Sequence, residues 1–128
     1  MTDLWYDETG EGPPLVLLHE GVVDARIWEP VLPLLAERHR VIRYDQRGFG
    51  RSPRPDGPYS LVDDLVGVLD AAGVDRAALA GASRGGNIAL ATTVDHPERV
   101  AALILLGSGL SGAQLDVCLL YTSPSPRD

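Results

Sequence analysis

Hydrophobic residues gather in short continuous runs along the chain, and the stretches between the runs carry helical spacing or turn residues. Four such runs are Leu15–His19, Val41–Tyr44, Ala77–Ala82 and Val100–Leu106. Strands that are apolar throughout are typical of a parallel sheet that is covered on both faces. Leu4–Thr9 alternates more weakly and predicts an edge strand before the first run. The pattern therefore predicts an α/β fold.

The segments between the runs predict three helices. Apolar residues from Trp28 to Leu35 recur at helical spacing, and Pro33 should shorten or kink that helix. A second apolar face follows Ser60, which is a suitable N-cap, and Gly73 should stop that helix. An alanine-rich helical pattern follows Ala77–Ala82. Strands that alternate with helices in this way favour a mostly parallel sheet with helices on both faces.

Composition and charge narrow the classes of protein. The 128 residues are 45% hydrophobic with a net charge of −7, which fits one globular unit and argues against nucleic-acid binding. The start at Met1 lacks the features of a signal peptide, and Val100–Leu106 is too short to cross a membrane. The single cysteine, Cys118, cannot form an internal disulfide and argues against a metal cluster. We expect a soluble, cytoplasmic protein, and the sequence does not indicate its oligomeric state.

The most informative motif is Gly81-Ala82-Ser83-Arg84-Gly85, a G-x-S-x-G sequence between a predicted strand and a predicted helix. A serine at such a bend adopts a strained backbone, and the flanking glycines avoid collisions with the adjoining chain. The motif alone also fits a flexible Gly-Ser loop. A phosphate-binding loop fits less well, because Ser83 interrupts G-x-G-x-x-G and no Gly-Lys-Ser/Thr follows.

Two further motifs extend the pattern. Leu17–Gly21, with Trp28 downstream, resembles the L-L-H-G…W oxyanion loop of α/β-hydrolases, and Asp45–Ser52 resembles their D-x-R-G-x-G-x-S turn. Together with the G-x-S-x-G bend they occur in the family's order, and the resemblance extends to about Ser111. It implies a truncated α/β-hydrolase fold, with residues 1–115 as the N-terminal part of the domain and with no metal or organic cofactor.

The resemblance also implies the parts of an active site. Ser83 would be the nucleophile, and the backbone N–H groups of Gly21 and Arg84 would be the oxyanion donors. Glu20 departs from the family's usual glycine, and we predict that it turns away or pairs with Arg84 or Arg47. The implied substrate is a small ester, lactone or similar carbonyl compound. A haloperoxidase-like, lyase or C–C hydrolase activity stays open, as does a non-catalytic receptor or binding module.

Other polar or aromatic residues of these motifs have a structural interpretation. His19 could be a base, but we expect it to shape its loop. Asp45 and Arg47 should hold a turn rather than transfer protons. Trp28 should belong to the core rather than form a substrate platform.

A base for Ser83 is missing from the sequence pattern. The fold orders its triad as Ser, acid, His, and the only histidine after Ser83 is His96. A helix between them would separate the two by roughly 18 Å, so His96 is not the base. No acid can be placed either, since Asp95 and Glu98 share that remote end and Asp116 lies past the region of resemblance.

The C-terminal residues look different. Residues 116–128 resemble a translated sequencing-adapter end, and we interpret them as an artefactual or disordered tail. Val100–Leu106 would then be an unprotected edge strand, which invites aggregation. We expect the chain alone to be poorly soluble and inactive.

Overall fold

The structure, a computed structural model, describes residues 2–107 and the backbone of residues 117–122. Its six-stranded sheet has the order β1-β3-β2-β4-β5-β6. Strands β2 to β5 run parallel, while β1 and β6 lie antiparallel at the two edges. The strands are β1 (Tyr6–Thr9), β2 (Pro14–Leu18), β3 (Arg40–Tyr44), β4 (Ala77–Ala82), β5 (Val100–Leu106) and β6 (Val117–Thr122). The predicted mostly parallel sheet is confirmed.

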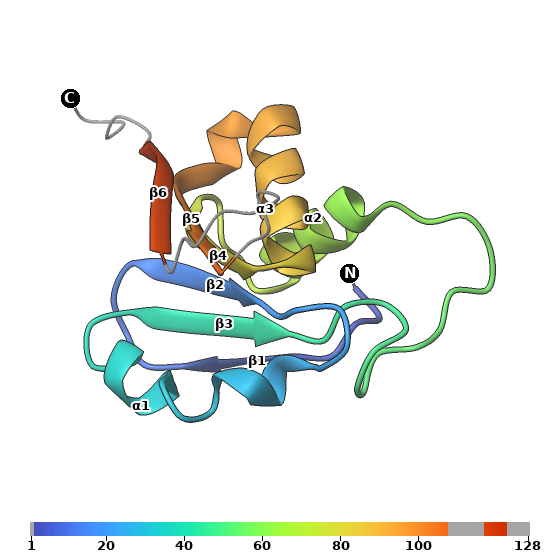
Figure 1. Ribbon diagram of the computed structural model, residues 1–128, viewed down its shortest axis with the longest axis horizontal. Coiled ribbons are helices and arrows are strands. Elements are labelled where there is room, and N and C mark those ends of the chain that lie inside the picture. Colours follow the sequence, from blue (N-terminus) through green and yellow to red (C-terminus); the bar gives the residue numbers. More distant parts are fainter. Residues whose placement is uncertain (1, 108–116, 123–128) are drawn as a thin grey trace.

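Helices cover both faces of this sheet (Figure 1). The helices α2 (Leu61–Ala71) and α3 (Arg84–Asp95) lie on one face, and the short turns η1 (Ala25–Trp28) and α1 (Leu32–Leu35) lie on the other. A short turn, η2 (Pro97–Arg99), leads from α3 into β5. None of the helices in the described part of the chain is both long and apolar enough to span a membrane.

The predicted helix from Trp28 to Leu35 is divided into two short pieces. Pro33 lies in the first turn of α1, where its missing N–H costs no helical hydrogen bond. It therefore marks the start of a helix rather than a kink inside one. The second helix follows its predicted signals, because the Ser60 hydroxyl accepts from the Asp63 N–H at 3.1 Å. Gly73 follows α2 with φ +69°, a conformation that favours glycine.

Alternation along β2 separates two hydrophobic clusters. Val16 and Leu18 pack with the buried residues of α2 and α3, whereas Leu15 and Leu17 pack with Trp28 and β3. Trp28 is buried, as expected for a core residue. Side chains therefore pack on the parallel strands from both faces of the sheet. Because β2 to β5 run parallel, their carboxyl ends all lie along the same side of the sheet, which we call its carboxyl edge.

The prediction that β5 forms an exposed edge is wrong. The strand β6 pairs with it antiparallel, from Ala102 opposite Thr122 to Leu106 opposite Val117. The returning chain supplies partners to backbone groups that β5 would otherwise leave unpaired. Val117–Thr122 belongs to the tail that we interpreted as artefactual or disordered, and residues 116 and 123–128 lie outside the described residues. The division into residues 1–115 and 116–128 stays a prediction.

Candidate active site

Three candidate residues follow the carboxyl ends of neighbouring parallel strands. His19 comes directly after β2, Asp45 after β3 and Ser83 after β4. Since β2 pairs in parallel with both β3 and β4, these ends lie at one edge of the sheet. Ligands of open α/β sheets bind at this edge. The structure therefore brings the three sequence motifs to one place.

Ser83 occupies a sharp bend between β4 and α3. Its backbone has φ +51° and ψ −112°, and it is the only non-glycine residue with a positive φ in the described part of the chain. The residue is exposed, and its hydroxyl does not cap α3. Its carbonyl accepts from the Asn87 N–H at 3.1 Å, so the helix starts immediately after the bend. A relaxed Gly-Ser loop is excluded by this geometry.

The two glycines of the motif are required by close backbone packing. A Cβ on Gly81 would collide with the Gly85 carbonyl and lie 2.6 Å from the Gly86 nitrogen. A Cβ on Gly85 would collide with the Leu18 carbonyl, where β2 ends. The first turn of α3 therefore packs directly on the ends of β2 and β4. This packing holds the strained conformation of Ser83 in place.

Gly21 and Arg84 lie beside each other at this bend. A Cβ on Gly21 would lie 3.3 Å from Cδ of Arg84 and 3.7 Å from its Cβ. Arg84 is the first residue of α3, and N–H groups in a first helical turn have no helical acceptor. Of the two residues predicted to supply the donors, Gly21 thus lies against the side chain of Arg84, and Arg84 directly follows Ser83.

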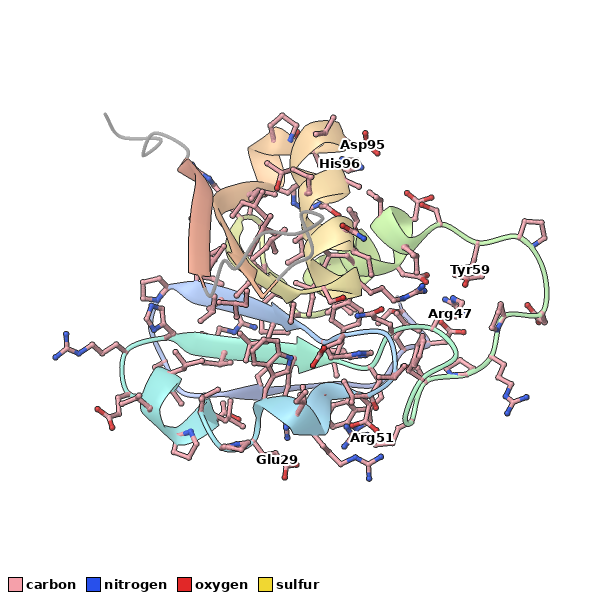
Figure 2. All side chains as sticks on the ribbon, in the orientation of Figure 1. Glu29, Arg47, Arg51, Tyr59, Asp95 and His96 are labelled. Carbon is pink, nitrogen blue, oxygen red and sulfur yellow. The ribbon has the colours of Figure 1, made fainter. Side chains whose placement is uncertain are left out.

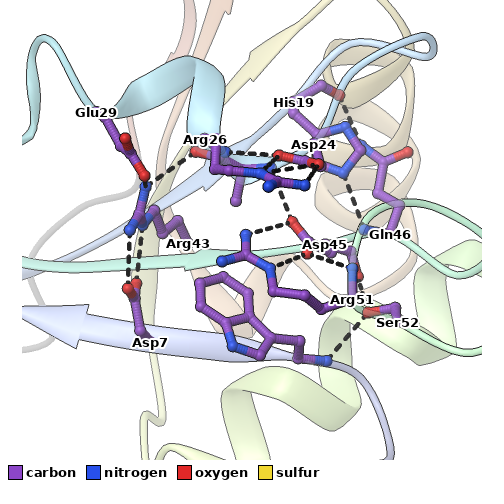
Figure 3. A network of polar contacts seen from close by, with 12 residues as sticks. Asp7, His19, Asp24, Arg26, Glu29, Arg43, Asp45, Gln46, Arg51 and Ser52 are labelled. Atoms are coloured by element: carbon purple, nitrogen blue, oxygen red, sulfur yellow. Dashed lines mark hydrogen bonds and ion pairs between the residues drawn. The ribbon is translucent and has the colours of Figure 1, made fainter.

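His19 is fully buried and both of its ring nitrogens have partners. The Gln46 N–H donates to its Nε2 at 2.9 Å (Figure 3), and its Nδ1 lies 2.6 Å from the Glu20 carbonyl. Because Nε2 accepts, Nδ1 carries the proton and donates to Glu20. Burial lowers the pKa of His19 below its ordinary value of 6.5. The ring is a neutral structural element of the loop, as expected from the sequence.

Gln46 connects this loop to the bend at Ser83. Its side-chain Nε2 donates to the His19 carbonyl at 2.6 Å, and its Oε1 accepts from Nε of Arg84 at 2.9 Å. The guanidinium carbon of Arg84 also lies 5.3 Å from the centre of the Phe49 ring. Sequence analysis missed Gln46. A signal was present, since an amide side chain directly follows a predicted buried strand and Asp45.

Asp45 organises the turn beneath these residues (Figure 3). Its buried carboxylate accepts from the backbone N–H groups of Ala25 and Arg51, both at 2.8 Å, and from Nε of Arg51 at 2.7 Å. Burial alone would raise the pKa of Asp45, but these donors and the Arg51 charge lower it below its ordinary value. Ser52 donates to the Asp45 carbonyl and accepts from the Trp5 N–H. The expectation that Asp45 holds a turn is confirmed.

Of the two alternatives for Glu20, the pairing with Arg84 or Arg47 does not occur among the described residues. Arg47 pairs instead with Asp3 at 3.0 Å and with Asp64 at 2.9 Å, which ties the turn after β3 to the N-terminus and to α2. Arg84 bonds Gln46, and no ion pair joins it to Glu20 within the described residues. Arg47 was expected to hold a turn rather than transfer protons, and these two ion pairs agree with that role.

No histidine of the chain is placed to act as a base for Ser83. His39 precedes β3 at the opposite edge of the sheet, and its Nδ1 contacts the Leu35 carbonyl at 3.2 Å. His96 follows the last residue of α3, at the far end of that helix (Figure 2). Both nitrogens of His19 are engaged. No group of three His, Cys, Asp or Glu side chains that could hold a metal ion occurs among the residues described.

Comparison with known proteins agrees with this geometry. The sequence profile of the alpha/beta hydrolase fold family matches residues 13–126. The chain is 47% identical over 108 residues to the 2-hydroxymuconate semialdehyde hydrolase of Pseudomonas sp. (strain CF600), and the match covers 79% of this chain and 38% of that protein. The chain thus spans well under half the length of this curated relative.

Solved structures give the same result. Est816, described as an N-acyl homoserine lactone degrading enzyme, superposes with a TM-score of 0.78 and 44% identity, over 83% of this chain and 42% of that one. The enol-lactonase of Burkholderia xenovorans superposes with a TM-score of 0.72 and 35% identity, over 76% of this chain and 40% of that one. The resemblance stated from the motifs is confirmed, and the chain belongs to the alpha/beta hydrolase fold family.

Proposed function

We propose that this chain carries the nucleophile and the oxyanion hole of a serine hydrolase that acts on a small ester, lactone or similar carbonyl compound. The observation that carries the proposal is Ser83, an exposed serine in a strained conformation at the end of β4. A strained bend of this kind lifts the hydroxyl clear of the sheet, at the start of a helix. The relatives with printed activities are hydrolases or lactone-degrading enzymes, which supports the same class.

In the proposed reaction, Ser83 Oγ attacks the substrate carbonyl carbon and forms a tetrahedral intermediate. The negative charge on the carbonyl oxygen is stabilised by the backbone N–H groups of Gly21 and Arg84, each worth on the order of a hundredfold in rate. The leaving group departs with a proton, and an acyl-enzyme on Ser83 remains. Water then attacks the ester of Ser83 and releases the acid.

The proton transfers require a base that the three histidines of this chain do not supply. His19 is buried and neutral, while His39 and His96 lie away from Ser83. We propose that the histidine and its acid belong to the part of longer relatives that this chain does not span. The 128-residue chain alone should then show no turnover, since a serine hydroxyl is a weak nucleophile without a base.

A chimera tests the proposal directly. Residues 1–107 of this chain replace the matching segment of the 2-hydroxymuconate semialdehyde hydrolase, whose remaining length supplies the rest of the domain. We expect a fluorophosphonate to label Ser83 and the chimera to hydrolyse a p-nitrophenyl ester, and Ser83→Ala to abolish both. A folded chimera, as judged by circular dichroism, that is never labelled at Ser83 would contradict the proposal and favour a binding module.

The substrate panel should include alternatives to simple esters. A homoserine lactone and 2-hydroxymuconate semialdehyde are the compounds suggested by the names of two relatives. Turnover that depends on added peroxide would instead favour a haloperoxidase-like activity. Each of these activities would use the same Ser83, so the panel separates substrates rather than sites.

A further inference from the structure

Among the described residues, the side chain of Arg84 is hydrogen-bonded through one nitrogen. Its Nε donates to Oε1 of the buried Gln46 at 2.9 Å, and its guanidinium carbon lies 5.3 Å from the centre of the Phe49 ring. Its Cδ adjoins Gly21. The guanidinium group is therefore fixed at the carboxyl edge of the sheet, beside the bend that carries Ser83.

The other two nitrogens of this group differ from Nε in having no partner among the described residues. Within residues 2–107, Nη1 and Nη2 of Arg84 make no hydrogen bond or ion pair. The neighbouring arginines differ, because Arg47 and Arg51 each direct a terminal nitrogen to a carboxylate, at 2.9 Å from Asp64 and 3.2 Å from Asp45. A guanidinium group has five N–H donors, and Gln46 occupies only one of them in Arg84.

A small apolar groove adjoins Arg84. It has a volume of about 210 Å³ and lies between the start of α2 and the exposed side of α3. Asn87, one of its lining residues, donates its backbone N–H to the Ser83 carbonyl, so the groove begins one helical turn from the bend. Leu61, Val62, Ile88 and Ala91 provide apolar walls. The groove thus combines hydrocarbon surface with a single cation.

We propose that Arg84 binds a carboxylate group carried by the substrate or by the acid product, with the aliphatic part of that molecule in the groove. This inference rests on the proposed function, because it assigns a substrate class to the same site. A planar guanidinium group matches a carboxylate with two parallel N–H···O bonds. The chain has a net charge of −7, so attraction of an anion at this place depends on Arg84 rather than on the overall field.

Binding to the 128-residue chain tests the inference without any catalysis. The probe is hexanoate, hexanamide is its neutral control, and the readout is the ¹⁵N–¹H signal of Arg84 Nε together with the Arg84 and Gly21 amides. We expect hexanoate at tens of millimolar to shift these signals in a saturable way and hexanamide to bind at least about tenfold more weakly.

Variants separate this inference from the proposed function. Arg84→Gln should weaken hexanoate binding about tenfold, and Arg84→Lys should weaken it less, since a lysine keeps the charge but not the planar fork. Arg38→Gln, near the opposite edge of the sheet, should bind as the unsubstituted chain does. Equal binding of hexanoate and hexanamide, no binding of either, or undiminished binding by Arg84→Gln would overturn the inference. Ser83→Ala should keep hexanoate binding even though the proposed function requires it to abolish labelling.

Discussion

Gln46 offers the sharpest test of how the structure positions the proposed oxyanion donors. Its side chain is the only link, among the described residues, that bonds both the loop before Gly21 and the side chain of Arg84. Replacement by leucine keeps a side chain of similar size but removes both hydrogen bonds. The backbone N–H of residue 46 can still donate to Nε2 of His19, so the histidine keeps its tautomer.

The size of the effect follows from what each lost bond leaves behind. The His19 carbonyl loses a donor at 2.6 Å in a buried place, and an unsatisfied buried acceptor costs about 1–3 kcal/mol. Arg84 Nε is half-buried, so water can replace its lost acceptor and the cost there is about 1 kcal/mol or less. We therefore expect Gln46→Leu to lower the free energy of unfolding by about 1–4 kcal/mol. That is a large part of the total stability of an ordinary domain.

Urea unfolding followed by circular dichroism measures this loss, and amide hydrogen exchange locates it. We expect faster exchange in Gln46→Leu, under native conditions, at two hydrogen-bonded amides of this place: the N–H of residue 46, which donates to His19, and the N–H of Asn87, which donates to the Ser83 carbonyl. Gln46→Glu is the matched control: it keeps an acceptor for Arg84 but sets a carboxylate oxygen against the His19 carbonyl, so at pH 7 it should not recover the stability of the unsubstituted chain. The reasoning is refuted if Gln46→Leu unfolds within about 0.5 kcal/mol of the unsubstituted chain and leaves exchange at both amides unchanged.

Three further predictions concern the same edge of the sheet. Gly85→Ala should lower the free energy of unfolding by about 2 kcal/mol or more, because the added Cβ collides with the backbone of β2. Gly57→Ala is the control: its added Cβ has no atom within 4 Å, so thermal unfolding should be unchanged. Burial lowers the pKa of His19 in the folded chain, so the unfolded chain takes up this proton at a higher pH. The free energy of unfolding should therefore fall as the pH drops below about 6.5. His19→Asn should reduce this dependence on pH in unfolding experiments between pH 7 and pH 5. Ser83→Gly should be more stable than Ser83→Ala by about 1 kcal/mol in urea unfolding, because glycine accepts φ +51° without strain; equal stabilities would argue against strain at this bend.

Local patterns predicted the sheet and the bend because each depends on residues close in the chain. Continuous apolar runs identified the four parallel strands, and the G-x-S-x-G motif identified the strained serine. The spacing of strands and helices then placed Ser83 and His19 at one edge. Such features follow from short-range steric rules and from the right-handed parallel connection.

Features that depend on contacts between residues far apart in the chain could not be predicted from the sequence. Gln46 and Arg84 are far apart in the chain, and neither local sequence pattern predicts the hydrogen bond between their side chains. The sequence left open whether Glu20 turns away or pairs with an arginine. It could not decide between these, because the pairing of Arg47 with Asp3 and Asp64 depends on contacts between segments far apart in the chain. The strand β6 was missed because the composition of its segment suggested a tail, whereas pairing with β5 depends on backbone groups.

In the proposed serine hydrolase, the described residues would supply the backbone part of the active site and not the groups that transfer protons. Under the proposed function, the parts that need a precise backbone are the strained bend at Ser83, the close approach of Gly21 to Arg84 and the neutral His19 that fixes the loop before Gly21. Strain of about 1–3 kcal/mol at one residue persists only where the surrounding packing determines it, and β2, β4 and α3 supply that packing. Proton transfer, by contrast, needs a histidine within hydrogen-bond reach of Ser83 and an acid that orients it, and the three histidines of this chain are not placed in this way. A site of this kind can therefore be organised for binding an oxyanion before any base is in place, and so carboxylate binding at Arg84 and labelling of Ser83 are separable experiments.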